Sequence, residues 1–123
     1  MSNFFVRFNC VEVAKTLIKN EADASHPNSQ GITPLHYAAQ RGSQEMAGLL
    51  LDLKEVNVNA RDGSQLTSLH WACIHGNEEV CRLLLRRKAD ILARSVDLMT
   101  PLHFAAFCGN PGVVELILKE GMM

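Results

Sequence analysis

The stretch "TPLHYAAQRG" at residues 33–42 returns as "TSLHWACIHG" at 67–76 and again as "TPLHFAAFCG" at 100–109. The three copies begin at Thr33, Thr67 and Thr100, a spacing of 34 and then 33 residues. A second apolar stretch follows each copy, within 43–53, 77–90 and 110–121. Self-similarity at such a period indicates stacked supersecondary units, none of which buries its apolar faces alone.

Each unit is predicted to contain two short helices. The threonine is a good N-cap because its hydroxyl accepts from an early helical N–H, and proline or serine follows at the first helical position. We expect the first helix to end at Gly42, Gly76 and Gly109, since glycine suits a left-handed cap. The second helix has an apolar face at i, i+3, i+4 spacing, formed by Met46, Leu49 and Leu50, by Val80, Leu83 and Leu84, and by Val113, Leu116 and Ile117.

Polar, turn-forming stretches separate the units and predict a projecting hairpin or loop after each helix pair. Gly31 is the turn glycine of the first complete unit, but Gln65 and Leu98 stand at the equivalent places. We therefore expect those two turns to be strained or reshaped, with Gly63 as an alternative left-handed residue.

An incomplete unit precedes the others. The stretch 10–23 aligns with 77–90 and is predicted to be its second helix. Phe5 and Val6 align where the other units have small residues, which predicts an atypical first helix there.

The motif T-P-L-H-x-A-A-x-x-G, followed by a leucine-rich helix and A-D at this period, resembles the ankyrin repeat over about residues 22–121. The resemblance implies an all-α solenoid of helix-turn-helix units with projecting β-hairpins or loops. We expect a partial or atypical first repeat at 1–27, repeats at 28–61 and 62–94, and a repeat at 95–123 that is truncated at its C-terminal end. In this family the hairpin tips and first helices form a concave groove that usually binds another protein.

His70, Cys73 and His75 resemble a metal site or a nucleophile with its base. On a helix, however, His75 lies about 140° away from His70. The first histidine also recurs in every unit as His36 and His103, whereas Cys73 is replaced by alanine. We therefore expect the recurring histidines to hydrogen-bond threonine and nearby backbone, as the resemblance also implies, and Cys73 to pack as a small residue. No catalytic, metal or cofactor site is expected.

An aromatic residue, Tyr37, Trp71 or Phe104, follows each recurring histidine. Partial burial between units is one interpretation, and a partner-binding stripe or a base-stacking platform are the others. No cationic stripe runs beside the row, which disfavours nucleic acid. The basic run at 86–88 is interpreted as a solvated helix end rather than a docking patch.

Positions that differ between matched units are where a partner could be recognised. Ile32, Leu66 and Met99 are apolar residues at one place in the unit, and we expect them to be exposed in a line that forms a groove with Ile74 and Phe107. The candidate partner-binding residues are Ile32, Gln40, Arg41, Leu66, Trp71, Ile74, His75, Met99, Phe104 and Phe107.

The composition is that of a water-soluble domain, with 47% hydrophobic and 20% charged residues and a net charge of -1, so no global field attracts nucleic acid or anionic lipid. Four cysteines without a CxxC pair favour a reducing compartment, and we find no signal peptide or membrane-spanning run. We expect an intracellular, cytoplasmic or nuclear monomer.

The predicted function is a non-enzymatic module that binds a partner protein or peptide, as part of a larger adaptor, regulator or channel. The alternative is a regulatory segment attached to an enzyme, with no catalysis of its own. Neither function requires a cofactor.

Overall fold

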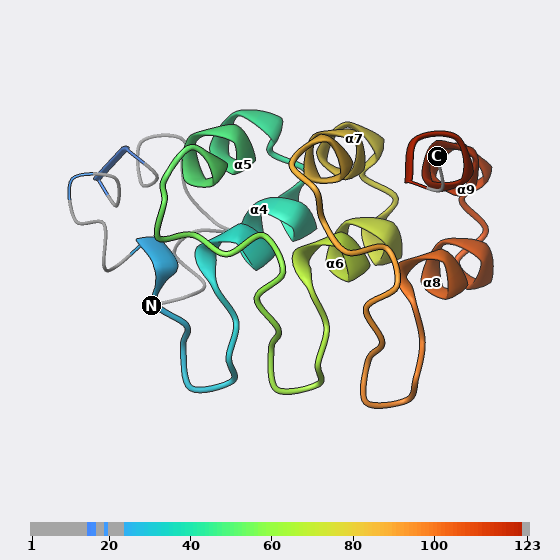
Figure 1. Ribbon diagram of the computed structural model, residues 1–123, viewed down its shortest axis with the longest axis horizontal. Coiled ribbons are helices and arrows are strands. Elements are labelled where there is room, and N and C mark those ends of the chain that lie inside the picture. Colours follow the sequence, from blue (N-terminus) through green and yellow to red (C-terminus); the bar gives the residue numbers. More distant parts are fainter. Residues whose placement is uncertain (1–14, 17–18, 20–23, 122–123) are drawn as a thin grey trace.

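The computed structural model describes residues 15–16, 19 and 24–121. From Pro34 onward the chain forms six α-helices and a closing π-helical turn, which stand in a regular row (Figure 1). In chain order they are α4 (Pro34–Arg41), α5 (Gln44–Leu51), α6 (Ser68–His75), α7 (Glu78–Arg86), α8 (Pro101–Phe107), α9 (Pro111–Leu116) and η1 (Ile117–Gly121). No strand is present among the described residues.

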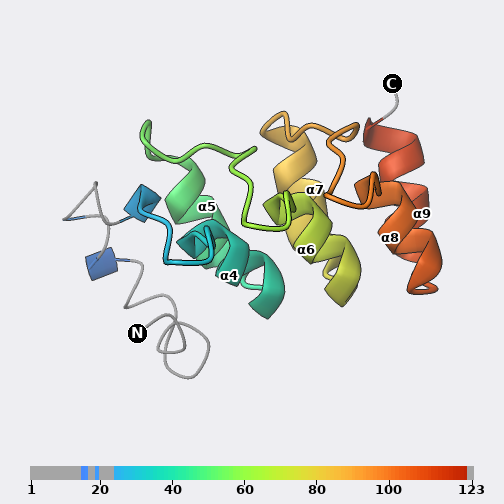
Figure 2. The ribbon, with the colours of Figure 1, turned by 90° about the horizontal axis from the view of Figure 1, so that it is seen from below.

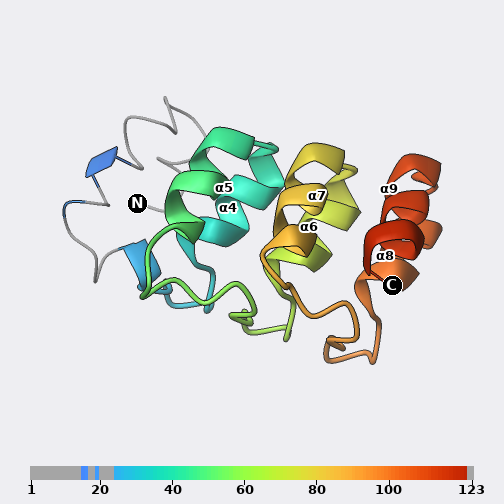
Figure 3. The ribbon, with the colours of Figure 1, turned by 45° about the horizontal axis from the view of Figure 1, so that its top comes forward.

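The helices form two layers. The first helices α4, α6 and α8 pack in succession, α4 against α6 and α6 against α8, and each also packs against its own second helix, α5, α7 or α9. The second helices pack side by side as the other layer, which Figure 3 brings forward, and Figure 2 shows the first layer from below. Three loops project from the first layer on the side away from the second helices (Figure 1). This is the all-α repeat architecture that the sequence predicts.

The first helix of each unit begins as its sequence predicts. Thr33, Thr67 and Thr100 adopt extended N-cap conformations, and each side chain accepts from the backbone N–H of the histidine three residues later. Gly42 and Gly76 are left-handed caps with φ of 77° and 67°. The expected end of α8 is displaced slightly, because Cys108 is its C-cap in a right-handed conformation and the left-handed residue, Gly109, follows.

The three projecting loops contain the same turn, at residues 28–32, 62–66 and 95–99, which we call the first, second and third hairpin turns. In each, the N–H of the first residue donates to the carbonyl of the fifth at 2.9 Å. Gly31, Gln65 and Leu98 have φ of 78°, 63° and 64°, so the turn keeps one shape whether or not glycine is present. The turns at Gln65 and Leu98 are therefore strained, as one of the two alternatives predicts, and they are not reshaped. Gly63 does not supply the left-handed residue, because its φ is not positive.

Buried side chains from both layers form one continuous core. The predicted apolar faces of the second helices supply Met46, Leu50, Val80, Leu84, Val113, Leu116 and Ile117, each at most 6% exposed. Small residues fill the contacts between first helices, where Ala39 and Cys73 are fully buried. The close approach of successive units therefore depends on the small residues of the repeated motif.

Two predictions concern residues that the structure does not describe. Phe5 and Val6, where an atypical first helix is predicted, lie outside the described residues, as does most of the stretch 10–23 that is predicted to be a second helix.

Candidate protein-interaction surface

Two open hollows lie between adjacent hairpin turns. One has a volume of about 390 Å³ and is lined by Gln30, Ile32, Asp62, Gly63 and Ser64. The other has a volume of about 430 Å³ and is lined by Gly63, Ser64, Leu66, Ser95, Val96, Asp97 and Phe104. Because they share Gly63 and Ser64, the two hollows form one surface along the edge of the stack. Of the residues predicted to bind a partner, Ile32, Leu66 and Phe104 lie on it.

Ile32, Leu66 and Met99 are half-buried rather than exposed in a line, so that expectation is wrong. The cause is their position at the base of the hairpin turns, where the carbonyl oxygens of Leu66 and Met99 lie 2.9 Å from histidine Nε2 atoms of the preceding unit. Within the three hairpin turns, the large apolar side chains that are exposed belong to the third turn instead. Val96 is 63% exposed and Leu98 is 66% exposed.

The aromatic row is half-buried between units. The Trp71 ring lies 5.3 Å from the His36 ring and 6.0 Å from the Tyr37 ring, and the rings of Phe104 and His70 are 5.6 Å apart. Trp71 also donates its Nε1–H to the Asp62 carboxylate at 3.1 Å. These contacts place Trp71 and Phe104 against the preceding unit, and Phe104 still lines the second hollow.

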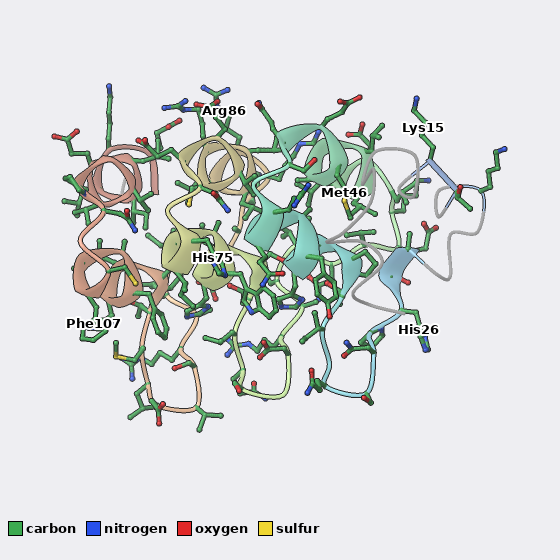
Figure 4. The ribbon with its side chains drawn as sticks, turned by 180° about the vertical axis from the view of Figure 1, so that it is seen from behind. Lys15, His26, Met46, His75, Arg86 and Phe107 are labelled. Atoms are coloured by element: carbon green, nitrogen blue, oxygen red, sulfur yellow. The ribbon has the colours of Figure 1, made fainter. Side chains whose placement is uncertain are left out.

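The remaining candidates lie near the ends of the first helices and line neither hollow. Arg41 and His75 are exposed, whereas Gln40 and Ile74 are half-buried. The side-chain oxygen of Gln40 is buried and has no hydrogen-bond partner among the described residues. Phe107 is 84% exposed and stands at the end of the stack (Figure 4). His75, the last residue of α6, lies near the middle of the stack (Figure 4).

The recurring histidines are structural in the two inner units. The backbone N–H of Thr33 donates to His36 Nδ1 at 3.0 Å, and His36 Nε2 lies 2.9 Å from the Leu66 carbonyl. His70 repeats this arrangement with Thr67 and Met99. Since a carbonyl only accepts, each Nε2 carries a proton, and since each Nδ1 accepts a threonine N–H it carries none, so each ring is neutral. Burial lowers the pKa of both histidines below the ordinary value of 6.5.

The cysteines of the α6–α7 unit pack as small core residues. The Sγ atoms of Cys73 and Cys81 are 4.0 Å apart, and both residues are fully buried. Hydrogen bonding to Cys81 and then burial raise the pKa of the Cys73 thiol, which opposes a nucleophilic role. In the described part of the chain, no cluster of three or more potential ligands could hold a metal ion.

Two arginines of the basic run at the end of α7 form ion pairs with neighbouring units. Arg87 contacts Asp52 of the preceding unit at 2.8 Å, and Arg86 lies 3.7 Å from Glu120 of the following one. The sequence interpretation of a helix end is therefore supported, and the charges tie neighbouring units together.

Sequence reasoning missed the residues that shape the hairpin turns and join the helices. Side-chain oxygens of Asn28, Asp62 and Ser95 each accept two backbone N–H groups within their own turn. Asn77 donates from its side chain to the carbonyls of Ala39 and Gln40 in the preceding unit. The recurrence of short polar side chains at the period of the repeat was the available signal.

Two stacked layers of short helices with loops projecting along one edge define a helical repeat protein. The family model for ankyrin repeats, in three copies, matches residues 3–95 and 62–122. The chain belongs to the ankyrin repeat family.

A curated relative is the alpha-latroinsectotoxin-Lt1a of Latrodectus tredecimguttatus, which is 35% identical over 91 residues. The match covers 72% of this chain but only 6% of the toxin, so the chain spans a small part of that relative. No helix in the described residues is long and apolar enough to cross a membrane.

Proposed function

We propose that this chain binds a partner protein through the hairpin edge, by accepting an apolar side chain of the partner between the second and third hairpin turns. Ankyrin repeats are generally protein–protein interaction modules. The observation that carries the proposal is the hollow of about 430 Å³, in which Leu66 and Phe104 form an apolar floor and Val96 an exposed wall. Exposed apolar side chains around a hollow are typical of binding sites.

The charge of this hollow narrows the chemistry of the partner. Asp97 is exposed and lines the hollow, with Ser64 and Ser95 beside it, and no basic side chain is part of the lining. A peptide segment with a large apolar residue next to lysine or arginine therefore fits better than an acidic one. Arg41 and His75 are exposed on the first helices, and we propose that they contact parts of the partner that lie outside the hollow.

The same features support a non-catalytic, intracellular role. Ankyrin repeats are typically non-catalytic. The buried titratable groups of the inner units are committed to packing and capping. The described cysteines are free thiols, which suits a reducing compartment. We also propose that the partner is a protein, that the chain is a monomer, and that it binds neither nucleic acid nor a cofactor.

The test is a displayed library of random peptides, selected on the intact chain and then assayed for binding to two variants. Val96→Glu places a charge in the wall of the hollow and is expected to abolish binding of the selected peptides. Leu92→Glu is the matched control, because Leu92 is 69% exposed but lies outside the hollow. Equal binding of the selected peptides to both variants, with both folded by circular dichroism, would place the site elsewhere.

A further inference from the structure

The hollow between the first and second hairpin turns contains a carboxylate that the turn itself does not require. Asp62 is 7% exposed and lines this hollow, and its Oδ1 accepts the N–H groups of Ser64 and Leu66. The neutral side chains of Asn28 and Ser95 accept two N–H groups in the same way in the other two turns. The negative charge of Asp62 is therefore not needed for the shape of the turn.

No cation among the described residues forms an ion pair with Asp62. The ion pairs in this part of the chain use other carboxylates, those of Asp52, Glu79 and Glu120. Arg61 precedes Asp62 in the sequence, but its guanidinium donates to the carbonyl of Arg94 at 2.8 Å. Because a buried charge is costly unless it is paired, the Asp62 carboxylate favours a cation supplied from outside the chain.

The Asp62 carboxylate also has room for a further donor. Its Oδ1 accepts two backbone N–H groups, and its Oδ2 accepts the Nε1–H of Trp71 at 3.1 Å. A carboxylate has about four lone-pair sites, so these three donors leave one site on Oδ2. A cationic donor at that site would make a charge-assisted hydrogen bond, which is stronger than a neutral one.

The two hollows of the hairpin edge are copies of one arrangement with different linings. Gly63 of the first hollow stands at the position of Val96 in the second, and Asp62 stands at the position of Ser95. The first hollow therefore has a buried carboxylate and no side chain at the place of the apolar wall. Its other lining residues are Gln30, Ile32 and Ser64. The second hollow suits an apolar side chain, and the first suits a positively charged one.

The backbone of the second hairpin turn offers an incoming group acceptors rather than donors. The N–H groups of residues 62–66 all donate within the protein, to oxygens of Gln30, Asp62 and Leu66. The carbonyls of Gly63 and Gln65 receive no hydrogen bond from the described residues. An anion would find no backbone donor here, whereas a guanidinium has five donors and no acceptor.

We propose that the hollow between the first and second hairpin turns binds an arginine side chain of the partner, whose guanidinium donates to Asp62 Oδ2. A guanidinium suits a buried carboxylate because it is more weakly hydrated than an ammonium group. The inference rests on the proposed function, in which the same partner places an apolar side chain between the second and third turns. Packed helices lie about 8–10 Å apart, and an extended chain advances about 3.3 Å per residue. The arginine therefore lies about three residues from the apolar side chain along the partner.

The test is a nuclear magnetic resonance titration of the full chain with the peptide N-acetyl-Leu-Ala-Ala-Arg amide. This peptide carries an apolar and a cationic side chain three residues apart. Trp71 is the only tryptophan of the chain, so its indole N–H gives one signal, which reports on Asp62. The backbone N–H of Val96 reports on the second hollow.

Replacement of the arginine in the peptide by glutamine is expected to raise the dissociation constant about tenfold and to abolish the shift of the Trp71 indole signal. Replacement by lysine is expected to weaken binding by less than replacement by glutamine does. Equal dissociation constants for the arginine and glutamine peptides overturn the proposal, as does a Trp71 signal that the arginine peptide does not move. Tighter binding of the lysine peptide overturns the assignment to a guanidinium.

Two variants locate the cation. Asp62→Ser copies Ser95, which holds the same turn, and is expected to make the chain bind the arginine and glutamine peptides equally. Asp97→Ser is the matched control, because Asp97 is an exposed carboxylate of the second hollow, and is expected to leave the preference for arginine intact. A preference that survives Asp62→Ser, or that Asp97→Ser removes as well, overturns the proposal. The comparison of peptides needs no change to the protein, so it decides the matter even if Asp62→Ser does not fold.

The two reporters separate this inference from the proposed function. If the arginine peptide moves the Val96 signal without the Trp71 signal, the proposed function is supported and the arginine site is overturned. If it moves the Trp71 signal without the Val96 signal, the arginine site is supported and the apolar side chain binds elsewhere.

Discussion

The imidazole Nε2 of His36 lies 2.9 Å from the carbonyl oxygen of Leu66, a residue 30 positions further along the chain. Because the Nδ1 of the same ring accepts from Thr33, one side chain caps its own helix and anchors the next hairpin turn. The recurring histidine therefore couples local helix formation to the stacking of units, and it does so in its neutral form.

Acidification is expected to destabilise the protein. Burial lowers the pKa of His36 and His70 in the folded state, while the unfolded chain keeps a value near 6.5. Well above pH 6.5 both states are neutral and these groups contribute no pH dependence. As the pH falls below 6.5 the unfolded state binds protons first, so the free energy of unfolding falls, by at most about 1.4 kcal/mol per pH unit for each histidine. Urea unfolding at pH 7.5, 6.5 and 5.5 measures this slope.

A matched pair of variants tests whether His36 contributes to this dependence of the free energy of unfolding on pH. His36→Gln is expected to reduce it, whereas His75→Gln is expected to leave it unchanged because His75 is exposed. A slope that is the same in both variants would show that other groups are responsible.

Asn77→Ala is expected to cost more stability than Asn110→Ala. Asn77 donates to two carbonyls of the preceding unit, Ala39 and Gln40, whereas Asn110 donates to Cys73 alone, at 3.3 Å. Neither side chain caps its own helix, so the comparison isolates the bonds between units. We expect a loss of about 1–3 kcal/mol for Asn77→Ala and about 0.5–1.5 kcal/mol for Asn110→Ala in urea unfolding. The reverse order would contradict this assignment.

Gln65→Gly and Leu98→Gly are each expected to stabilise the chain by about 0.5–1 kcal/mol, because both residues hold positive φ values that glycine adopts without strain. Gly31→Ala at the equivalent position is expected to destabilise it, since the added Cβ would lie 3.0 Å from the backbone nitrogen of Gly63. Thermal unfolding measures all three.

The control for the turn variants is Ser64→Gly, at a neighbouring position without a positive φ. This change is expected to lower stability, because glycine there only adds freedom to the unfolded chain. If Ser64→Gly also stabilises the chain, relief of a strained positive φ does not explain the effects of Gln65→Gly and Leu98→Gly.

Helix positions were predictable because their determinants are local. Thr33 caps, Pro34 follows without losing a donor and Gly42 ends the helix, so the sequence places α4 directly. The turn at Gln65 was expected to be strained or reshaped because it lacks the glycine of the first hairpin turn. It keeps the same shape because Asp62 accepts two hydrogen bonds from backbone N–H groups within the turn.

Exposure along the candidate surface depended on contacts between units, which the sequence of one unit does not contain. Met99 looks like an exposed apolar residue in the sequence, but its carbonyl is held by His70 of the preceding unit and its side chain is half-buried. Val96, two residues before the turn's left-handed position, is not among the residues predicted to bind a partner, and it is the exposed wall of the hollow.

Thiol reactivity tests the packing of the small-residue positions. In a Cys10→Ser background, one thiol, that of Cys108, is expected to react rapidly with Ellman's reagent in the native protein, because Cys108 is exposed and Cys73 and Cys81 are buried. The raised pKa of Cys73, caused by its hydrogen bond to Cys81 and by burial, slows its reaction further, since the thiolate is the reacting species. The remaining two thiols should appear only in urea, with the midpoint of global unfolding. Three thiols reacting at one rate in the absence of urea would show that α6 and α7 do not pack as described.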